Sequence, residues 1–264
     1  MSGREPTIDT TVPHSARVWN YWLGGKDNFP VDREAGEQFL ETFPGIAQMA
    51  RASRAFQERA VRHLAGEVGI RQFLDVGTGL PTANNTHEVA QSVAPESRIV
   101  YVDNDPLVLT HARGLLTSTP EGRTQYIHAD LYEPESVLEQ AGELLDLDQP
   151  VSLMLMGVLG HVQKYEEAVF LVQRLMAGLP PGSHLTVSEG SNVHSEANAA
   201  AQDEYNESGA VPYISRSPEQ IGGYLEGLEL LEPGLVPVTR WRPLAVGAEQ
   251  PAELDQYGGV GRKA

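Results

Sequence analysis

The chain has 264 residues and a formal charge of −17 at pH 7, and it contains no cysteine. This length is sufficient for one large domain with its own hydrophobic core, so disulfides are not needed for stability. The lack of thiols excludes thiolate nucleophiles and cysteine-ligated metals, and the negative charge argues against binding to a nucleic-acid backbone. No apolar run reaches the length of a signal peptide or a membrane span. We therefore expect a cytoplasmic protein whose partner is a small molecule rather than a nucleic acid or a membrane.

The first third of the chain predicts helices. Residues 14–23 and 31–40 have helical patterns, and each pattern ends at the glycine or proline residues that follow it. A longer helix is predicted over residues 46–68, where apolar side chains repeat every four positions and Arg and Glu lie on the other side. This apolar stripe consists of Ala52, Phe56, Ala60, Leu64 and Val68.

Beyond residue 70 the pattern changes to short, continuous apolar runs. The runs are 73–76, 99–102, 126–129, 151–156 and 185–187. Helical segments separate them, at 86–93, 106–116 and 134–145. Strands that alternate with helices in this way are typical of βαβ units and a parallel sheet. Because the runs are apolar throughout, the sheet is expected to be covered by helices on both faces.

The C-terminal part is less regular. Residues 188–216 are polar and aperiodic, and Ser217-Pro218-Glu219 then predicts a helix start. Residues 228–231 and 241–246 are two further strand candidates, the second limited by Pro243 to an edge position or a late start. The predicted organisation is an N-terminal extension over residues 1–45, a core domain over 46–246 and a C-terminal tail over 247–264.

Three successive predicted strands end in glycine or acidic residues. The first runs into a turn with Asp75, Gly77 and Gly79, Asp103 follows the second strand, and Asp130 follows the third. Open α/β sheets bind ligands at the carboxyl ends of their strands, and an acidic residue after the second strand can accept hydrogen bonds from ribose hydroxyls. Each aspartate alone could equally be a helix cap. The ordered set favours a bound nucleoside.

The glycine turn favours one kind of nucleoside over another. A dinucleotide-binding turn has a third glycine or an alanine, whereas this one has Thr82 there, and Pro81 delays the following helix. Asp75 beside two glycines suits a ligand with a cationic amino-acid end. This description fits S-adenosylmethionine better than NAD.

The sequence at these positions resembles a known family. FLDVGTG (73–79), VYVDNDP (100–106) and YIHADLYEP (126–134) resemble motifs I to III of the class I S-adenosylmethionine-dependent methyltransferases. More closely, four stretches along the chain resemble the bacterial S-adenosyl methyltransferase family, formerly described as a domain of unknown function. They are ARVWNYWLGGKDNFPVDREAG, RQFLDVGTGLPTANNTHEVAQ, VYVDNDPLVL and LELLEPGLVPVTRWRP. The resemblance implies a Rossmann-like α/β fold with helices on both faces of a seven-stranded, mostly parallel sheet, with strand order 3-2-1-4-5-7-6 and an antiparallel last strand.

The resemblance also implies roles for individual residues. The methionine portion of the cofactor would be held by Asp75, Gly77, Thr78 and Gly79. Asp103 would accept from the ribose hydroxyls, and the adenine would lie beside Asn104, Asp130 and Leu131. The sulfonium side would be lined by Gly157 and Val158. Pro81 departs from the family's third glycine, which leaves open how the turn meets the carboxylate of the cofactor.

The N-terminal segment has two interpretations. It is either a lid over the cofactor or a packing helix whose Trp19 and Trp22 fill a groove. The lid interpretation assigns cofactor contacts to Arg17, Tyr21, Gly25, Lys26 and Asn28.

His161 is the candidate general base, because it follows the fourth predicted strand and histidine titrates near neutral pH. The stretch HVQKYEEAV (161–169) is also similar to the segment that carries the catalytic histidine in small-molecule O-methyltransferases. The alternative is a loop histidine bonded to backbone. His194, Tyr213 and Arg216 lie in the irregular region and are candidates for a substrate pocket.

The sequence thus predicts an S-adenosylmethionine-dependent methyltransferase that acts on a hydroxyl or amino group of a small molecule, without a metal. Two alternatives stay open. One is a module that binds the cofactor or its demethylated product, S-adenosylhomocysteine, without catalysis. The other is an NAD-dependent oxidoreductase, against which Pro81 and Thr82 argue.

Overall fold

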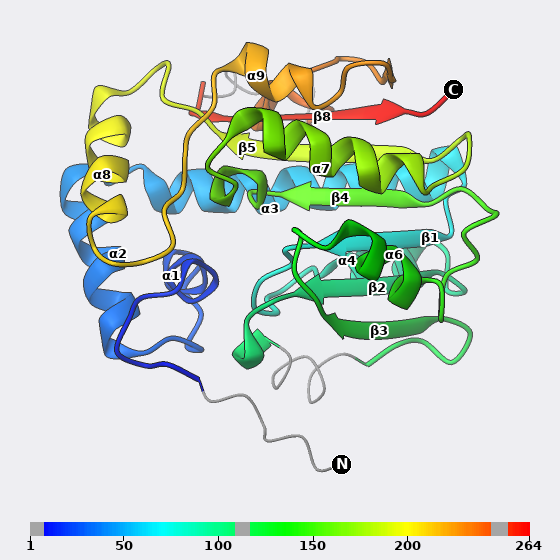
Figure 1. The fold of residues 1–264 in the computed structure, drawn as a ribbon, viewed down its shortest axis with the longest axis horizontal. Helices are drawn as coiled ribbons and strands as arrows, with labels where there is room; N and C mark the ends of the chain where they lie inside the picture. Colours follow the sequence, from blue (N-terminus) through cyan, green and yellow to red (C-terminus); the bar gives the residue numbers. More distant parts are fainter. Residues whose placement is uncertain (1–7, 109–116, 244–252) are drawn as a thin grey trace.

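The computed structural model describes residues 8–108, 117–243 and 253–264. Its centre is one mixed sheet with the strand order β3-β2-β1-β4-β5-β8-β6, and β7 pairs with β8 beside this path (Figure 1). The strands are β1 (Gln72–Val76), β2 (Arg98–Asp103), β3 (Arg123–His128), β4 (Ser152–Met156), β5 (His184–Gly190), β6 (Glu229–Leu230), β7 (Val236–Pro237) and β8 (Gln256–Arg262). The first five strands are parallel, and β8 is antiparallel to β5. The predicted fold class and strand order are confirmed, with the short β7 as an addition.

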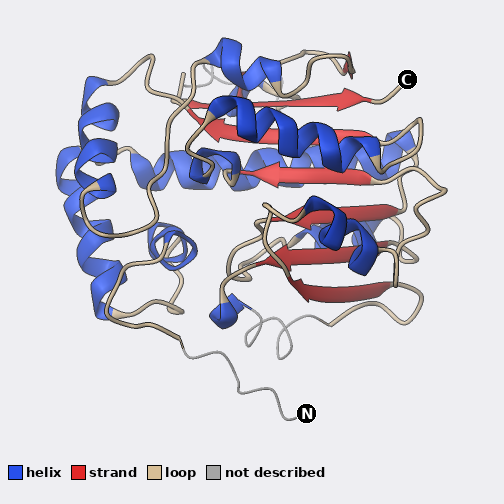
Figure 2. Cartoon of the chain, in the orientation of Figure 1, coloured by secondary structure: helices blue, strands red, loops and turns tan. Residues whose placement is uncertain are grey.

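Helices cover both faces of this sheet (Figure 2). They are α1 (Ser15–Trp22), α2 (Pro30–Thr42), α3 (Ile46–His63) with its π-helical continuation (Leu64–Val68), α4 (Thr86–Val93), α6 (Pro134–Ala141), α7 (Tyr165–Ala177), α8 (Glu196–Asn206) and α9 (Pro218–Gly223). Single turns of 3-10 helix lie at Leu159–His161 and Val238–Arg240. Within the described residues, no helix combines the length and apolar character needed to cross a membrane.

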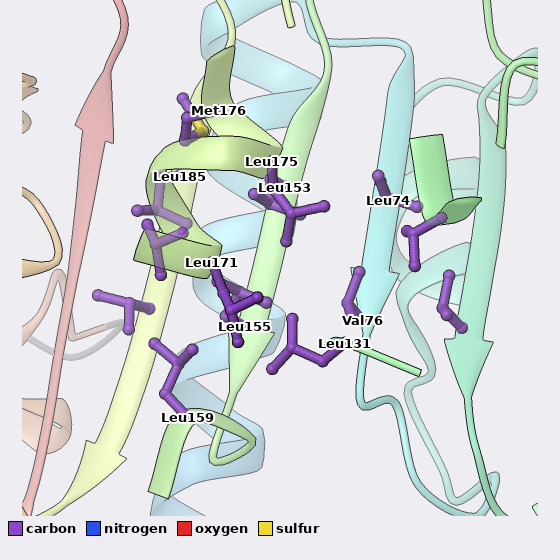
Figure 3. Close-up of a cluster of buried hydrophobic side chains, with 14 of the residues drawn as sticks. Leu74, Val76, Leu131, Leu153, Leu155, Leu159, Leu171, Leu175, Met176 and Leu185 are labelled. Carbon is purple, nitrogen blue, oxygen red and sulfur yellow. The ribbon is translucent and has the colours of Figure 1, made fainter. Parts of the chain in front are cut away.

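The alternation of side chains along each strand divides the core into two layers. Leu74 and Val76 of β1 pack with Leu153 and Leu155 of β4 against the α6 and α7 side, where Leu175 of α7 meets them (Figure 3). On the other side Phe73 packs with Phe56 of α3 and Val89 of α4. Asp75 has the same parity as Phe73, so the strand directs this carboxylate toward α3 and α4.

Three further helices, α1, α2 and α8, gather at the carboxyl ends of the parallel strands. In Figure 1 the arrows of β1 to β5 point toward α1, α2 and α8. These helices and the first turns of α3 share a third cluster, in which the Trp22 ring lies 5.0 Å from Phe39 and the Phe39 ring 6.4 Å from Tyr205. The predicted N-terminal extension is therefore a helical cover over one edge of the sheet.

The position of the antiparallel strand corrects the sequence prediction. We expected it at residues 241–246, but Trp241 is a buried core side chain whose ring lies 5.4 Å from Phe56, and residues 244–246 are outside the described part of the chain. The strand is β8, within the segment predicted as a C-terminal tail. Its sequence, QYGGVGR, contains three glycines. A Cβ on Gly258 would lie 2.7 Å from Phe56, and a Cβ on Gly261 would lie 2.8 Å from Leu228, so close packing requires glycine at both positions. Because of these glycines the segment lacks the continuous apolar run by which the other strands were predicted.

The predicted helices are confirmed over most of their length, but α7 was not among them, and two further points differ. Residues 109–116 of the predicted helix 106–116 lie outside the described residues. Helix α8 was not predicted, because its sequence EANAAAQDEYN is polar and has little apolar periodicity.

Candidate functional site

A cavity of about 310 Å³ lies at the carboxyl ends of β1, β2 and β4. The strand ends and the turns that follow them form one wall. Helix α1, the first half of α3, helix α8 and the segment 211–215 form the other. This is the edge at which parallel α/β sheets bind ligands.

The turn after β1 brings backbone close to this cavity. Gly77 and Gly79 have φ values of +73° and +67°, in the left-handed region that favours glycine. The N–H of Gly77 donates to the carbonyl of Val102 at 2.8 Å, which ties the turn to β2. A Cβ on Gly77 would lie 2.4 Å from Cγ2 of Val158, so the turns after β1 and β4 leave no space for a side chain at position 77. Thr78 also lines the cavity.

We expect Gly77→Ala to be more damaging than Gly157→Ala, although both glycines are left-handed. Gly157 has a φ of +77°, but its Cβ would meet no atom within 4 Å, so that variant should lose only about 1–2 kcal/mol of unfolding free energy from backbone strain. Gly77→Ala adds the collision with Val158 and should lose more. Urea unfolding of both variants measures the difference, and equal losses would contradict the steric argument.

Asp75 lies at the bottom of the cavity and is almost fully buried. Its Oδ2 accepts hydrogen bonds from the Thr86 hydroxyl at 2.6 Å and from Nε2 of Gln57 at 3.4 Å. Burial raises the pKa of Asp75 to about 6, although the Thr86 hydroxyl and the charge of Arg54 act to lower it. A carboxylate that is costly to ionise in this way is stabilised by a cationic ligand.

Asp103 and Asp130 lie on the same rim, and both line the cavity. Asp103 accepts from the N–H of Gly79 at 2.8 Å through Oδ2 and from the N–H of Asp105 at 2.9 Å through Oδ1. Burial raises the pKa of Asp103. Because each carboxylate oxygen has two lone pairs, Asp103 keeps acceptor capacity for a ligand.

The next strand end provides a second polar pair. Nδ2 of Asn104 donates to Oδ2 of Asp130 at 3.2 Å, and the N–H of Tyr132 donates to Oδ1 of Asp130 at 3.0 Å. Leu131 is buried between these polar groups and also lines the cavity. The order predicted from the sequence, from the glycine turn to Asp103 and then Asp130, is therefore the order of the residues along one cavity wall.

His161 lies across the cavity, beyond Gly157 and Val158, which line it as well. Its Nδ1 lies 3.1 Å from the carbonyl oxygen of Pro212. A carbonyl oxygen only accepts, so Nδ1 carries the proton and Nε2 has a free lone pair in the neutral ring. Burial lowers the pKa of His161, which keeps the ring neutral at pH 7. Within the described residues, Nε2 has no hydrogen-bond partner.

Glu189 holds the His161 turn in place, and the sequence analysis missed it. This fully buried carboxylate accepts from the N–H of Leu159 at 2.9 Å, the N–H of Gly160 at 3.1 Å and the Tyr213 hydroxyl at 2.7 Å. Burial raises the pKa of Glu189 to about 7. The Tyr213 ring lines the cavity and meets His161 edge-on at 5.2 Å. The available signal was an acidic residue two positions after the apolar run 185–187.

The five N-terminal residues assigned to cofactor contacts do not line the cavity in this structure. Arg17 and Tyr21 are four positions apart on α1, and this face turns toward α2. Arg17 donates to the carbonyls of Asp9 and Val12, and Tyr21 donates to Glu37. Asn28 donates to the carbonyl of Gly25 and to Oδ1 of Asn20. Asn20 lines the cavity, whereas Gly25, Lys26 and Asn28 are absent from its lining.

The other face of α1 lines the cavity instead. It contributes Val18, Trp19 and Trp22, and His14 precedes it. The helix therefore lies over the cavity, as the lid interpretation expected, but it packs there through the tryptophans that the alternative interpretation singled out.

Two of the three predicted pocket residues also lie elsewhere. His194 is exposed and hydrogen-bonds through Nε2 with the Tyr257 hydroxyl at 2.8 Å. Arg216 donates to the carbonyls of Val162 and Gln163 at 2.7 Å and 3.0 Å, where it fixes the segment after His161. Tyr213 is the one of the three that lines the cavity.

The chemistry of the wall fits S-adenosylmethionine. Left-handed glycines allow a close approach, Asp75 offers a negative charge to an ammonium group, and Asp103 offers acceptors to vicinal hydroxyls. Among the described residues, no group of three or more His, Asp or Glu side chains could hold a metal ion.

A mostly parallel sheet of this order, with a glycine turn after β1 and acidic residues after β2 and β3, defines the class I methyltransferase fold. The model of the S-adenosyl methyltransferase family matches residues 1–264, and the chain belongs to this family. The protein is therefore an S-adenosylmethionine-dependent methyltransferase, and S-adenosylmethionine is its cofactor.

Solved structures agree with this assignment. A DUF574 family protein from Streptomyces avermitilis is 45% identical, with a TM-score of 0.93 over 98% of this chain and 100% of that one. A protein from Thermobifida fusca is 37% identical, with a TM-score of 0.89 over 100% of this chain and 99% of that one. An O-methyltransferase family 2 protein from Planctomyces limnophilus, in complex with apigenin, shares the fold at 16% identity, with a TM-score of 0.51 over 89% of this chain and 66% of that one. A comparison with curated proteins gave no significant match.

Proposed function

We propose that this enzyme transfers the methyl group of S-adenosylmethionine to a hydroxyl or amino group of a small molecule. The observation that carries the proposal is the division of one cavity into two chemically different walls. The strand-end wall has the glycine turn and three carboxylates, whereas the helical wall is mainly apolar and aromatic.

In this proposal the strand-end wall binds the cofactor. Asp75 and the glycine turn hold its amino-acid end, and Asp103 accepts from the ribose hydroxyls. The adenine lies near Asn104, Asp130 and Leu131, whose Asn104–Asp130 hydrogen bond fixes the polar groups of this end. Gly157 and Val158 line the sulfonium side. When bound, the cofactor supplies an electrophilic methyl group on a sulfonium sulfur.

The helical wall receives the acceptor. Helix α1, helix α8 and the segment 211–215 contribute no acidic or basic side chain to the lining. Large rings come from Trp19, Trp22 and Tyr205, and Met49 of α3 lies among them. Such a surface stabilises an uncharged, partly apolar molecule by burying its surface.

His161 acts as the base in this proposal. Its Nε2 lone pair is free within the described structure, and the bond from Nδ1 to Pro212 fixes the ring orientation. The ring therefore takes the proton that the acceptor hydroxyl or amine loses. Glu189 and Tyr213 are positioning residues, because they hold the Leu159–His161 turn and the ring edge against His161.

The experiment is transfer of tritiated methyl groups from S-adenosylmethionine to the small-molecule fraction extracted from Streptomyces avermitilis, the source of the 45% identical protein. We expect label in low-mass, uncharged compounds and release of S-adenosylhomocysteine. Calorimetric binding of S-adenosylhomocysteine without any transfer would instead support a non-catalytic module. Label found only in nucleic acid or protein would contradict the proposed acceptor class.

A further inference from the structure

Arg54 of α3 is a half-buried cation that lines the cavity beside Asp75. Its Nη1 donates to Oε1 of Gln57 at 2.7 Å, and its Nη2 donates to the carbonyls of Ala83 and Asn84, each at 3.3 Å. Within the described residues no carboxylate lies at ion-pair distance from this guanidinium. Burial lowers the pKa of Arg54, and the charge of Asp75 acts in the opposite direction. A cation withdrawn from water without a paired anion is costly, and an anionic ligand would remove that cost.

Gln57 holds Arg54 and Asp75 in a fixed relation. A guanidinium only donates and a carboxylate only accepts, so the amide must present Oε1 to Arg54 and Nε2 to Asp75. The same Nε2 donates to the Thr86 hydroxyl at 2.9 Å, and that hydroxyl donates to Asp75. One amide therefore keeps a positive and a negative group beside each other on the cavity wall without joining them in an ion pair. This arrangement is complementary to a zwitterion.

Several backbone positions after the glycine turn cannot donate a hydrogen bond to an anion. Pro81 has no N–H, and the N–H of Thr82 already donates to Oδ1 of Asn85 at 3.0 Å. At the start of α4, the N–H of the capping residue Asn85 already donates to the carboxylate of Glu88 at 2.7 Å. At these positions an anionic ligand group would find no backbone donor, and Arg54 is a side-chain donor on the same cavity wall.

We propose that Arg54 binds the α-carboxylate of S-adenosylmethionine while Asp75 attracts the adjacent ammonium group. The inference rests on the proposed placement of the amino-acid end at the glycine turn. It assigns the anion-binding role to a helix that precedes the first strand, which explains how a turn with Pro81 in place of a glycine serves a cofactor with a carboxylate.

The test compares two ligands by isothermal titration calorimetry at pH 8, above the pKa of about 6 for Asp75, so that removing Arg54 leaves Asp75 ionised. One ligand is S-adenosylhomocysteine. The other is S-adenosyl-3-thiopropylamine, which keeps the amine and lacks the carboxylate. Arg54→Met should weaken binding of the first by roughly 10- to 100-fold, the value of a charge-assisted hydrogen-bonded pair, and leave binding of the second unchanged. Arg54→Lys keeps the positive charge but loses the paired N–H groups of the guanidinium. Its affinity for S-adenosylhomocysteine should lie between those of the wild type and Arg54→Met.

Arg62→Met is the matched control, because Arg62 lies on the same helix, is exposed and pairs with Glu58. It should bind both ligands like the wild type. Equal loss for both ligands in Arg54→Met, or no loss for either, would overturn the role of Arg54. If Arg54→Met does not fold, Arg54→Lys decides by the same comparison. Failure of the wild type to bind S-adenosylhomocysteine would contradict the proposed site as a whole, so the two failures are distinguishable.

Discussion

Replacing Asp103 with alanine should weaken binding of S-adenosylhomocysteine by at least about 100-fold, because two hydrogen bonds from ribose hydroxyls to a charged acceptor are lost. The same substitution leaves the N–H groups of Gly79 and Asp105 without their acceptors, so the turn itself loses support. The first effect acts on the nucleoside end of the ligand, and the second acts on the glycine turn. The loss should therefore extend to 5′-methylthioadenosine, which has the ribose but no amino-acid end.

Calorimetric titration of the two ligands measures this effect. Asp148→Ala, which removes an exposed carboxylate before β4, is the control and should bind both ligands normally. A thermal unfolding curve of each variant separates loss of contacts from loss of folding. Unchanged heat of binding in Asp103→Ala would mean that the ribose lies elsewhere, and the proposed orientation of the cofactor would be wrong.

The strand-end wall was predictable because it follows from strand order alone. Buried parallel strands can be recognised in the sequence as continuous apolar runs, and their carboxyl ends lie at the same edge of the sheet. Asp75, Asp103 and Asp130 needed no tertiary information beyond that rule, and all three line one cavity. Local sequence and global fold agree at these positions.

The helical wall was not predictable in the same way. Apolar side chains occur on more than one face of α1, so periodicity could not decide which of its faces meets the cavity. Arg54 and Gln57 lie on the polar side of α3, which a sequence pattern assigns to solvent. They reach the cavity because α3 passes behind the sheet (Figure 1) and its first turns pack in the same cluster as α1. Glu189 was missed because its partners, Gly160 and Tyr213, are distant in sequence from it.

His161→Gln should lower the rate of methyl transfer by about 100-fold or more, the usual contribution of a general base, while binding of S-adenosylhomocysteine stays at the wild-type level. The acceptor fraction labelled in the transfer assay serves as the substrate. His194→Gln is the control, because that histidine is exposed and bonded to Tyr257 away from the cavity. A His161→Gln variant with the wild-type rate would show that the acceptor loses its proton without this side chain.

The pH dependence gives a second measurement with a definite sign. A base works when unprotonated, so the rate should rise with pH through the pKa of His161, which burial places below its ordinary value. Glu189, with a pKa of about 7, adds a second rise, because the ionised carboxylate is the stronger acceptor for the N–H groups of Leu159 and Gly160 that shape the His161 turn. Glu189→Gln should remove the rise near pH 7 and keep the lower one. His161→Gln should remove the lower one.

The tautomer of His161 can be checked without any acceptor. Nitrogen-15 NMR distinguishes a protonated Nδ1 from a protonated Nε2, and the His161→Gln spectrum assigns the signal among the eight histidines of the chain. The bond to Pro212 predicts protonation at Nδ1 in the neutral ring. Protonation at Nε2 instead would place a donor where the mechanism needs a lone pair, and would exclude His161 as the base even if its substitution slowed the reaction.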